Sequence, residues 1–315
     1  MTRSCVNGLI TIPNLSYSAV LTVFNAEYTV GRAIQSILDQ SLSPSEIFVI
    51  DDNSQDRSCQ IIRDFSEKDP RISVIQNKSN LGQSQNRNTG AAKSTSDFIV
   101  FFDDDDQSLP DRALEHNKMF QLGATVSYVS SDIHYKNGYS VTARNLDYLG
   151  ILDLAELARK LLLGEIDNRY TNLAIPASTL AVCTKEFNSV GGFDPDLRRL
   201  EDVDLALKYS QSRHIFGFSS KPLVARYSTI SQAKGNGIDM KFEALLLDRY
   251  SNHFSHSEYV NAVKHCRTRQ LYFSRKHSLL SLHLITNPIY TFKLLLKPRS
   301  YTIRLLHDFK RKLKE

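Results

Sequence analysis

Four aspartates stand in a row behind an apolar run, in the stretch FFDDDDQSLP at residues 101–110. A smaller acidic group, DDNS at 51–54, also follows an apolar run. Adjacent carboxylates repel one another, so a cation or a basic partner is needed to balance them. Hard oxygen ligands suit Mg²⁺ or Mn²⁺, which bind through one or two carboxylates plus substrate phosphates. These residues therefore predict metal-assisted departure of a diphosphate.

A purely local role is the alternative for both acidic groups, because Asp and Asn often form turns and helix N-caps. For Asp51 the two interpretations are equally good. For residues 103–106 a turn or cap accounts for only one or two of the four acids, since the others would add repulsion without a partner. The longer run is the stronger candidate for a functional site.

The first half of the chain alternates strands and helices. Apolar runs predict strands at 18–24, 46–50, 72–76 and 97–102, and the segments between them predict helices at 27–41, 57–67 and 83–93. This alternation indicates a parallel sheet covered on both faces. Ligands of such sheets bind at the carboxyl ends of strands, near the reversal of strand order, which is where both acidic groups fall.

The second half is less regular. It predicts a strand at 178–183, a short helix closed by glycines at 184–193, a helix with acids in its first turn at 201–212, and two short strands in HIFGF and PLVARYS. After Gly237 the sequence becomes helical and increasingly basic.

Composition indicates an ordinary globular protein. The 315 residues are 41% hydrophobic and 23% charged, enough for one large α/β domain or for a domain of about 200–250 residues with an appendage. The cysteines, at 5, 59, 183 and 266, are far apart, which argues against a zinc site or a disulfide scaffold and favours a reducing, cytoplasmic compartment. No secretory signal follows Arg3 and no run approaches ~20 apolar residues, so we expect no membrane crossing.

Basic charge is concentrated at the C-terminus. Residues 293–315 carry eight Lys or Arg against two acids, a local charge of +6, whereas the whole chain has +5. In the segment from 298 onward, Phe309, Leu313 and either Leu305 or Leu306 fall on one helical face, and the basic residues fall mostly elsewhere. This pattern predicts either a helix on an anionic membrane surface or one packed on the main domain. No aromatic interleaving accompanies these charges, so we expect no nucleic-acid partner.

Three stretches together resemble the family 2 inverting glycosyltransferases of GT-A fold: VLTVFNAEYTVGRAIQSILDQSLSPSEIFVIDDNSQD, NLGQSQNRNTGAAKSTSDFIVFFDDDDQSLP and GGFDPDLRRLEDVDLALKY. Each is weak alone, but they occur in the family's order over residues 17–230. The resemblance implies a GT-A α/β fold, with a mixed, mainly parallel sheet, helices on both faces and a helical C-terminal extension. The implied domains are an extension at 1–16, a catalytic domain at 17–237 with nucleotide-binding (17–110) and acceptor (111–237) halves, and a basic helical extension at 238–315.

The resemblance also assigns the donor-binding positions. Phe24 matches the aromatic residue that packs against the nucleotide base, and Thr22 replaces the family's usual Pro. Asp52 matches the position that contacts the imide of a uracil ring, which favours a UDP-sugar without excluding dTDP. Arg87 matches a basic position beside the donor, although packing or a salt bridge explains an arginine there equally well.

The family's metal motif is an Asp, any residue and a second Asp, with a Pro further on. Aligned on Pro110, it falls on Asp103 and Asp105. Asp105 is then the metal ligand, and Asp103 lies near the ribose and the metal. Asp104 occupies the free position and is assigned to donor binding, whereas Asp106 begins the following turn. Either Mn²⁺ or Mg²⁺ fits these oxygen ligands.

Glu201 and Asp202 match the family's acidic pair, whose second member acts as general base. A carboxylate at a helix N-terminus is expected to be held ionised by the helix dipole, ready to accept a proton. Glu201 is assigned to the acceptor side or a supporting role, and a helix cap is the alternative for Asp202. Arg226 and Lys234 fall loosely where the family has a loop over the diphosphate.

The function implied is transfer of a hexosyl or N-acetylhexosaminyl group from a nucleotide-sugar to a hydroxyl of a glycan or lipid-linked glycan, in polysaccharide, O-antigen or capsule synthesis. The enzyme would work in the cytoplasm or on the cytoplasmic face of the membrane. Two alternatives remain. A non-catalytic nucleotide-sugar-binding module would need the fold but not the general base. A sugar-phosphate nucleotidyltransferase would need a Gly-rich phosphate loop, whereas NAEYTVGRA has one Gly.

Overall fold

The computed structural model describes residues 4–6, 9–11, 15–135, 137–163, 173–227, 238–273 and 277–287. Lys234 and the basic tail from 288 onward lie outside them. The chain divides into two compact units, one of residues 1–157 with 166–229 and the other of 158–165 with 230–315. The domain limits given above stay predictions. Near the N-terminus, β1 (Ser4–Val6) and β2 (Leu9–Thr11) pair as a separate two-stranded sheet.

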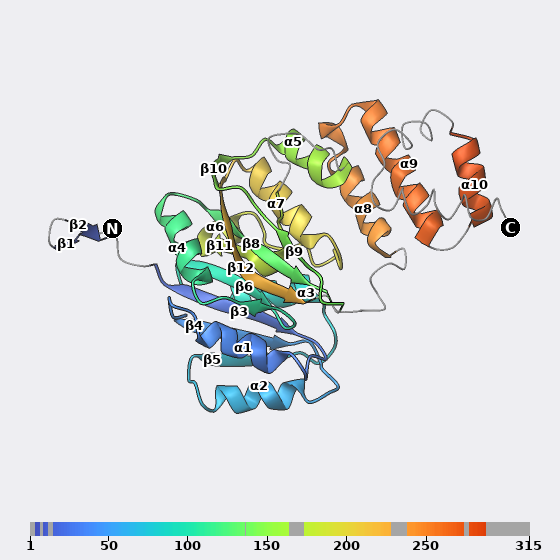
Figure 1. Ribbon diagram of the computed structural model, residues 1–315. Coiled ribbons are helices and arrows are strands. Elements are labelled where there is room, and N and C mark those ends of the chain that lie inside the picture. Colours follow the sequence, from blue (N-terminus) through green and yellow to red (C-terminus); the bar gives the residue numbers. More distant parts are fainter. Residues whose placement is uncertain are drawn as a thin grey trace. The chain divides into compact units, whose positions relative to one another are not determined.

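A ten-stranded mixed sheet forms the centre of the first unit, in the order β10-β12-β8-β11-β6-β3-β4-β5, with β7 on β12 and β9 on β8 (Figure 1). Its strands are β3 (Tyr17–Val23), β4 (Glu46–Asp51), β5 (Ile72–Gln76), β6 (Phe98–Asp103), β7 (Gln107–Ser108), β8 (Val126–His134), β9 (Ser140–Ala143), β10 (Tyr148–Ile151), β11 (Leu180–Cys183) and β12 (Ile215–Tyr227). The strands β3 to β6 are parallel, and β11 runs antiparallel to both of its neighbours.

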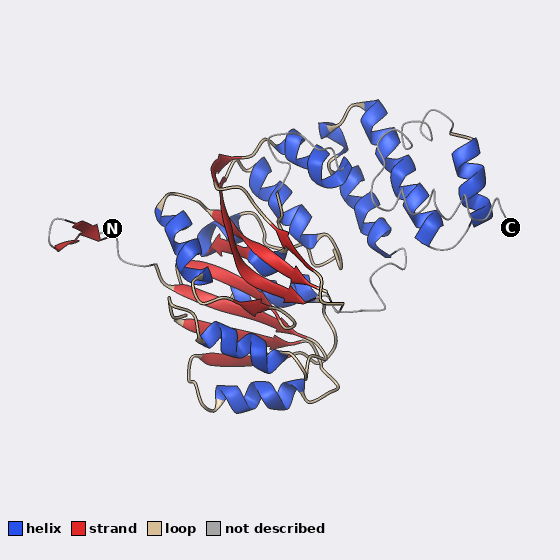
Figure 2. Cartoon of the chain, viewed as in Figure 1, coloured by secondary structure: helices blue, strands red, loops and turns tan. Residues whose placement is uncertain are grey.

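In the first unit α1, α2, α3, α4 and α6 pack on the sheet, and in the second unit α8 and α10 pack on α9 (Figure 2). The helices are α1 (Val30–Leu38), α2 (Ser58–Ser66), α3 (Gln83–Ala91), α4 (Arg112–Gln121), α5 (Leu154–Ala158), α6 (Thr184–Ser189) and α7 (Glu201–Gln211), then α8 (Ile238–Arg249), α9 (His256–Phe273) and α10 (His277–Ile285). The predicted mixed α/β sheet is confirmed. Two details differ, because the strand predicted at 178–183 begins with a 3-10 turn, and the two short strands predicted after His214 are one strand, β12.

Alternation along the strands places helices on both faces of the sheet. In β3, Ala19 and Leu21 belong to the apolar cluster that includes residues of α1, α2 and α4. The intervening Val20 points the other way, toward α3, as strand geometry requires. Phe101 of β6 extends that second face, with its ring 5.5 Å from Phe187 of α6. All these side chains are buried, so the predicted burial of both faces is confirmed.

The order of the strands reverses at β3. The chain goes from β3 outward to β4 and β5, and then returns to place β6 on the other side of β3. Thr22 near the end of β3 is directly opposite Asp103 at the end of β6, and Val23 is opposite Asp51 on β4. Both acidic groups therefore lie at the reversal point, where parallel sheets bind ligands.

Two helical glycines offer a test of this packing. A Cβ at Gly90 of α3 would lie 2.6 Å from Val20 Cγ1 and 2.9 Å from Ile50 Cδ1, so we expect Gly90→Ala to overpack the core and lower the free energy of unfolding by about 1–3 kcal/mol. At Gly31 of α1 the nearest atom would be 3.7 Å away, so Gly31→Ala should stabilise by up to about 1 kcal/mol. Urea unfolding of both variants measures the difference, and equal effects would contradict the close approach of α3.

Candidate active site

The end of β3 carries the first two donor-binding candidates. Thr22 is buried within the strand, where its backbone pairs with both neighbouring strands. Phe24 follows the strand and its side chain is 47% exposed, which leaves the aromatic surface accessible to a base. Of these two candidates, Phe24 is the one whose side chain a ligand could reach.

Asp52 holds the loop that precedes α3. Its carboxylate accepts hydrogen bonds from Asn77 Nδ2 (2.9 Å), Leu81 N–H (2.7 Å) and Gly82 N–H (2.9 Å). Burial by itself would raise the pKa of Asp52, but these donors outweigh it and the pKa is lowered. The group is thus ionised at neutral pH, and it also has a structural role that the sequence did not reveal.

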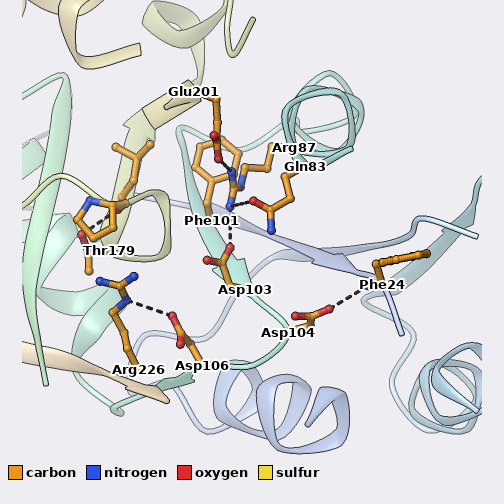
Figure 3. A network of polar contacts seen from close by, with 12 residues as sticks. Phe24, Gln83, Arg87, Phe101, Asp103, Asp104, Asp106, Thr179, Glu201 and Arg226 are labelled. Carbon is orange, nitrogen blue, oxygen red and sulfur yellow. Dashed lines mark hydrogen bonds and ion pairs between the residues drawn. The ribbon is translucent and has the colours of Figure 1, made fainter. Parts of the chain in front are cut away.

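Three of the four acids at residues 103–106, namely Asp103, Asp104 and Asp106, point to different partners, as Figure 3 shows. Asp104 accepts a hydrogen bond from Phe24 N–H at 2.9 Å, so the acidic run is tied to the residue that presents the aromatic ring. Burial raises the pKa of Asp104 to about 7, and the charges of Asp105 and Asp103 add to the rise. This crowding of negative charge is what the sequence led us to expect.

Two arginines approach the other end of the acidic run. Arg226 Nε lies 3.8 Å from Asp106 Oδ2, and Arg32 Nη2 donates to the backbone carbonyl of Asp105 at 2.8 Å. Asp106 is buried, and burial together with the charges of Asp103 and Asp105 raises its pKa. Asp106 therefore lies inside the charged cluster as well as in the turn, where its N–H donates to the carbonyl of Asp103. Arg32 was not predicted from sequence.

Arg87 connects the two halves of the site. The residue is 1% exposed, and its guanidinium donates from Nη2 to Asp103 Oδ1 at 2.7 Å and from Nη1 to Glu201 Oε1 at 2.8 Å (Figure 3). Burial by itself would lower the pKa of Arg87, but the two carboxylates raise it, so it stays charged. Of the two roles open from sequence, the structure places Arg87 in a salt bridge.

The acidic pair begins α7. Leu200, just before it, has φ of 62°, a left-handed conformation that is unusual for a leucine. Asp202 Oδ1 accepts a hydrogen bond from Val203 N–H at 2.8 Å. Burial, helped by the charge of Glu201, raises the pKa of Asp202 to about 7. The helix terminus was expected to hold this carboxylate ionised, but the loss of hydration and a like charge have the larger effect.

A polar face of α3 ties Arg87's helix to the segment before α7. Ser84 Oγ donates to the carbonyl of Leu197 at 2.8 Å, and Asn88 exchanges hydrogen bonds with the backbone of Phe193 at 2.7 and 3.0 Å. Sequence reasoning missed these residues. The signal was present, since QSQNRNTGA has almost no apolar side. A helix as polar as this either packs through hydrogen bonds or stays exposed.

The carboxylates do not by themselves form a complete metal site. Among the described residues no group of three or more His, Cys, Asp or Glu side chains is arranged to hold a metal ion. Asp103 and Asp105 offer oxygen donors in a cluster with excess negative charge, which fits a cation that takes few protein ligands and completes its coordination from a phosphate.

No helix in the described part of the chain is long and apolar enough to cross a bilayer.

Sequence comparison matches residues 18–189 to the profile of "Glycosyl transferase family 2". An uncharacterized glycosyltransferase of Haemophilus influenzae is 33% identical over 141 residues, which are 43% of this chain and 56% of that protein. An Escherichia coli protein, UDP-Glc:alpha-D-GlcNAc-diphosphoundecaprenol beta-1,3-glucosyltransferase WfgD, is 29% identical over 127 residues, 40% of this chain and 49% of that protein. The matched regions thus span about half the length of these relatives.

A solved structure has a similar fold. Residues 1–349 of S. aureus TarS, in complex with UDP-GlcNAc, superpose with a TM-score of 0.58 at 18% identity, covering 83% of this chain and 74% of that one. At this identity the likeness concerns the fold.

Proposed function

Since the chain belongs to glycosyl transferase family 2, we propose that it moves a sugar from a nucleotide-sugar to a hydroxyl of a glycan or lipid-linked glycan, with inversion at the anomeric carbon. One observation carries this proposal: Arg87 links Asp103, at the end of β6, to Glu201, whose neighbour Asp202 is the candidate base. The donor-side acids and the base are thereby fixed relative to each other inside one folded unit.

The donor we favour is a UDP-sugar. Phe24 would pack against the base and the ionised Asp52 would accept a hydrogen bond from the uracil imide. Two comparisons support this choice, because the E. coli relative is named for UDP-Glc and the TarS structure holds UDP-GlcNAc. The transferred group is then a hexosyl or N-acetylhexosaminyl residue.

Asp202 is the proposed general base. A base is most effective when its pKa lies near the working pH, and the pKa of Asp202 is about 7. The carboxylate takes the proton of the acceptor hydroxyl as that oxygen attacks the anomeric carbon and the bond to the diphosphate breaks. An α-linked UDP-sugar gives a β-linked product, in line with the β-linkage in the name of the E. coli relative.

Asp105 and Asp103 would hold a divalent cation, Mn²⁺ or Mg²⁺. When bound there, it would supply positive charge to stabilise the diphosphate leaving group. Asp104 would contribute to donor binding through the hydrogen bond that it accepts from Phe24 N–H, which would position the Phe24 backbone beside the nucleobase. Arg226, paired with Asp106, adds a cation on the same side of the site.

The proposed acceptor is a lipid-linked glycan in polysaccharide, O-antigen or capsule-type synthesis, since the E. coli relative is named for a diphosphoundecaprenol acceptor. The reaction then takes place in the cytoplasm, at the membrane, where the basic C-terminal segment would help to hold the enzyme. A non-catalytic binding module is less well supported, because it would not need Glu201, the neighbour of the candidate general base, to be linked through Arg87 to the donor side.

Release of UDP from a panel of UDP-sugars tests the proposal. We expect Mn²⁺-dependent release from at least one sugar, accelerated by acceptor, and a fall of about 10²-fold or more in Asp105→Asn, which removes a ligand charge. Asp64→Asn, an exposed acid on α2, is the matched control and should behave as wild type. If no donor is turned over but UDP-sugar still binds by calorimetry, the binding-module alternative is correct.

A further inference from the structure

The helix α10 is apolar on more than one side. Its sequence, HSLLSLHLI, places five apolar residues in nine positions. A helix with apolar residues all round is stable in water only if something covers each side. The described part of the chain covers one side of α10.

The covered side faces α9. Leu280 is 3% exposed and packs with Leu271 of α9, and Leu284 joins the same cluster. The backbone carbonyl of Lys264 on α9 lies 3.3 Å from His283 Nε2, which fixes the two helices side by side, as Figure 2 shows.

The opposite side is open to solvent. Leu279, Leu282 and Ile285 are 50%, 57% and 75% exposed. Their spacing of three residues places them along one stripe of the helix. Three large aliphatic side chains at this exposure are more than the scattered single residues of an ordinary protein surface.

The charge of this region indicates what covers the stripe. Residues 256–315 contain 13 Lys or Arg and three acids, a net +10, whereas residues 1–255 contain 26 and 31, a net −5. On α9, the charges of Arg267 and Lys264 act on α10 directly: burial lowers the pKa of His283, and these two cations lower it further. A partner for the stripe must therefore be apolar inside and negatively charged outside.

We propose that Leu279, Leu282 and Ile285 form a membrane-docking surface that enters the headgroup layer of an anionic bilayer. Apolar residues that sink into the interface and basic residues that attract anionic lipids act together in such binding. A second copy of the chain fits less well, because two segments of +10 would repel each other. The inference rests on the proposed function for its purpose, since a lipid-linked acceptor is confined to the bilayer.

Vesicle flotation of the full-length chain tests the surface. Wild type should float with phosphatidylglycerol/phosphatidylethanolamine vesicles, weakly with phosphatidylcholine alone, and less at high salt. The triple variant Leu279→Ser/Leu282→Ser/Ile285→Ser should lose at least about tenfold in partition coefficient. Leu122→Ser is the matched control, since Leu122 is 66% exposed at the end of α4, and it should float as wild type.

Three results would overturn the inference. The first is that the triple variant floats as well as wild type, and the second is that Leu122→Ser loses as much flotation as the triple variant. The third is that, without vesicles, sedimentation shows dimers of wild type that the triple variant does not form. UDP release from a soluble donor, measured on the same samples, keeps the two proposals apart. Flotation without any donor turnover upholds the docking surface and counts against the proposed activity.

Discussion

Asp202→Asn should lower the transfer rate by about 10²–10⁴-fold while leaving the dissociation constant of the donor nearly unchanged. The amide keeps the shape of the side chain and can still cap α7, but it cannot accept the proton of the acceptor hydroxyl. In the wild type the rate should rise with pH through about 7, since the pKa of Asp202 is about 7 and only the ionised form is a base. Steady-state rates from pH 5.5 to 9 and calorimetric titration with UDP measure both effects.

The same substitution has an opposite effect on folding. The pKa of Asp202 is raised from an ordinary value of 3.8, so ionising this group costs folding free energy, and that cost grows as pH rises from about 4 to 7. Asn never ionises, so we expect the variant to be more stable than wild type at pH 8, by about 1 kcal/mol or more, and the difference to shrink toward pH 4. Asp196→Asn, at an exposed acid on the same segment, should change neither quantity. A variant that is inactive because it is less stable at pH 8 would point to a cap, not a base.

Arg87→Met should give the largest loss of stability in the site. It leaves Asp103 and Glu201 without the cation that both contact, and breaking a buried ion pair in this way costs about 3–5 kcal/mol, or a Tm lower by roughly 6–20 °C. Transfer should fall with it, even at temperatures where the variant is folded, because the two carboxylates then repel each other. Calorimetric melting and transfer rates well below Tm measure the two effects.

Lysine at the same position separates charge from geometry. Arg87→Lys keeps the charge, but one ammonium cannot reproduce two parallel contacts made by different guanidinium nitrogens, so it should recover part of the stability and little of the activity. Removing one acid as well, in Arg87→Met/Glu201→Gln, should also recover part of the stability. Arg63→Met, an exposed arginine on α2, should stay within about 0.5 kcal/mol of wild type. An Arg87→Met that melts like wild type would mean that the bridge adds no net stability.

Much of the first half was predictable because local patterns there agree with the fold. Apolar runs of strand length separated by amphipathic stretches such as α1 define the parallel strands, and these bring both acidic groups to the same edge of the sheet. The second half was less predictable. Nothing local distinguishes one strand from two in β12, since its continuity depends on pairing with β8, β10 and β7.

Within the site, residue types and spacing identified the acids but not their partners. The ion pairs of Arg87 join residues that are 16 and 114 positions apart in sequence, so only the folded chain reveals them. The same holds for the pKa of Asp202. A helix N-terminus is visible in the sequence, whereas the burial and the nearby Glu201 charge that outweigh it depend on three-dimensional packing.

The hydrogen bond from Phe24 N–H to Asp104 has a consequence for the order in which ligands bind. It links Phe24, which would contact the nucleobase, to the acidic run, which would contact the cation. The two ligand sites are therefore connected by one hydrogen bond. If a bound cation strengthens nucleotide binding by some factor, thermodynamic reciprocity requires the nucleotide to strengthen cation binding by the same factor. The donor site would then fill cooperatively, with either ligand alone weakly held and the pair held tightly.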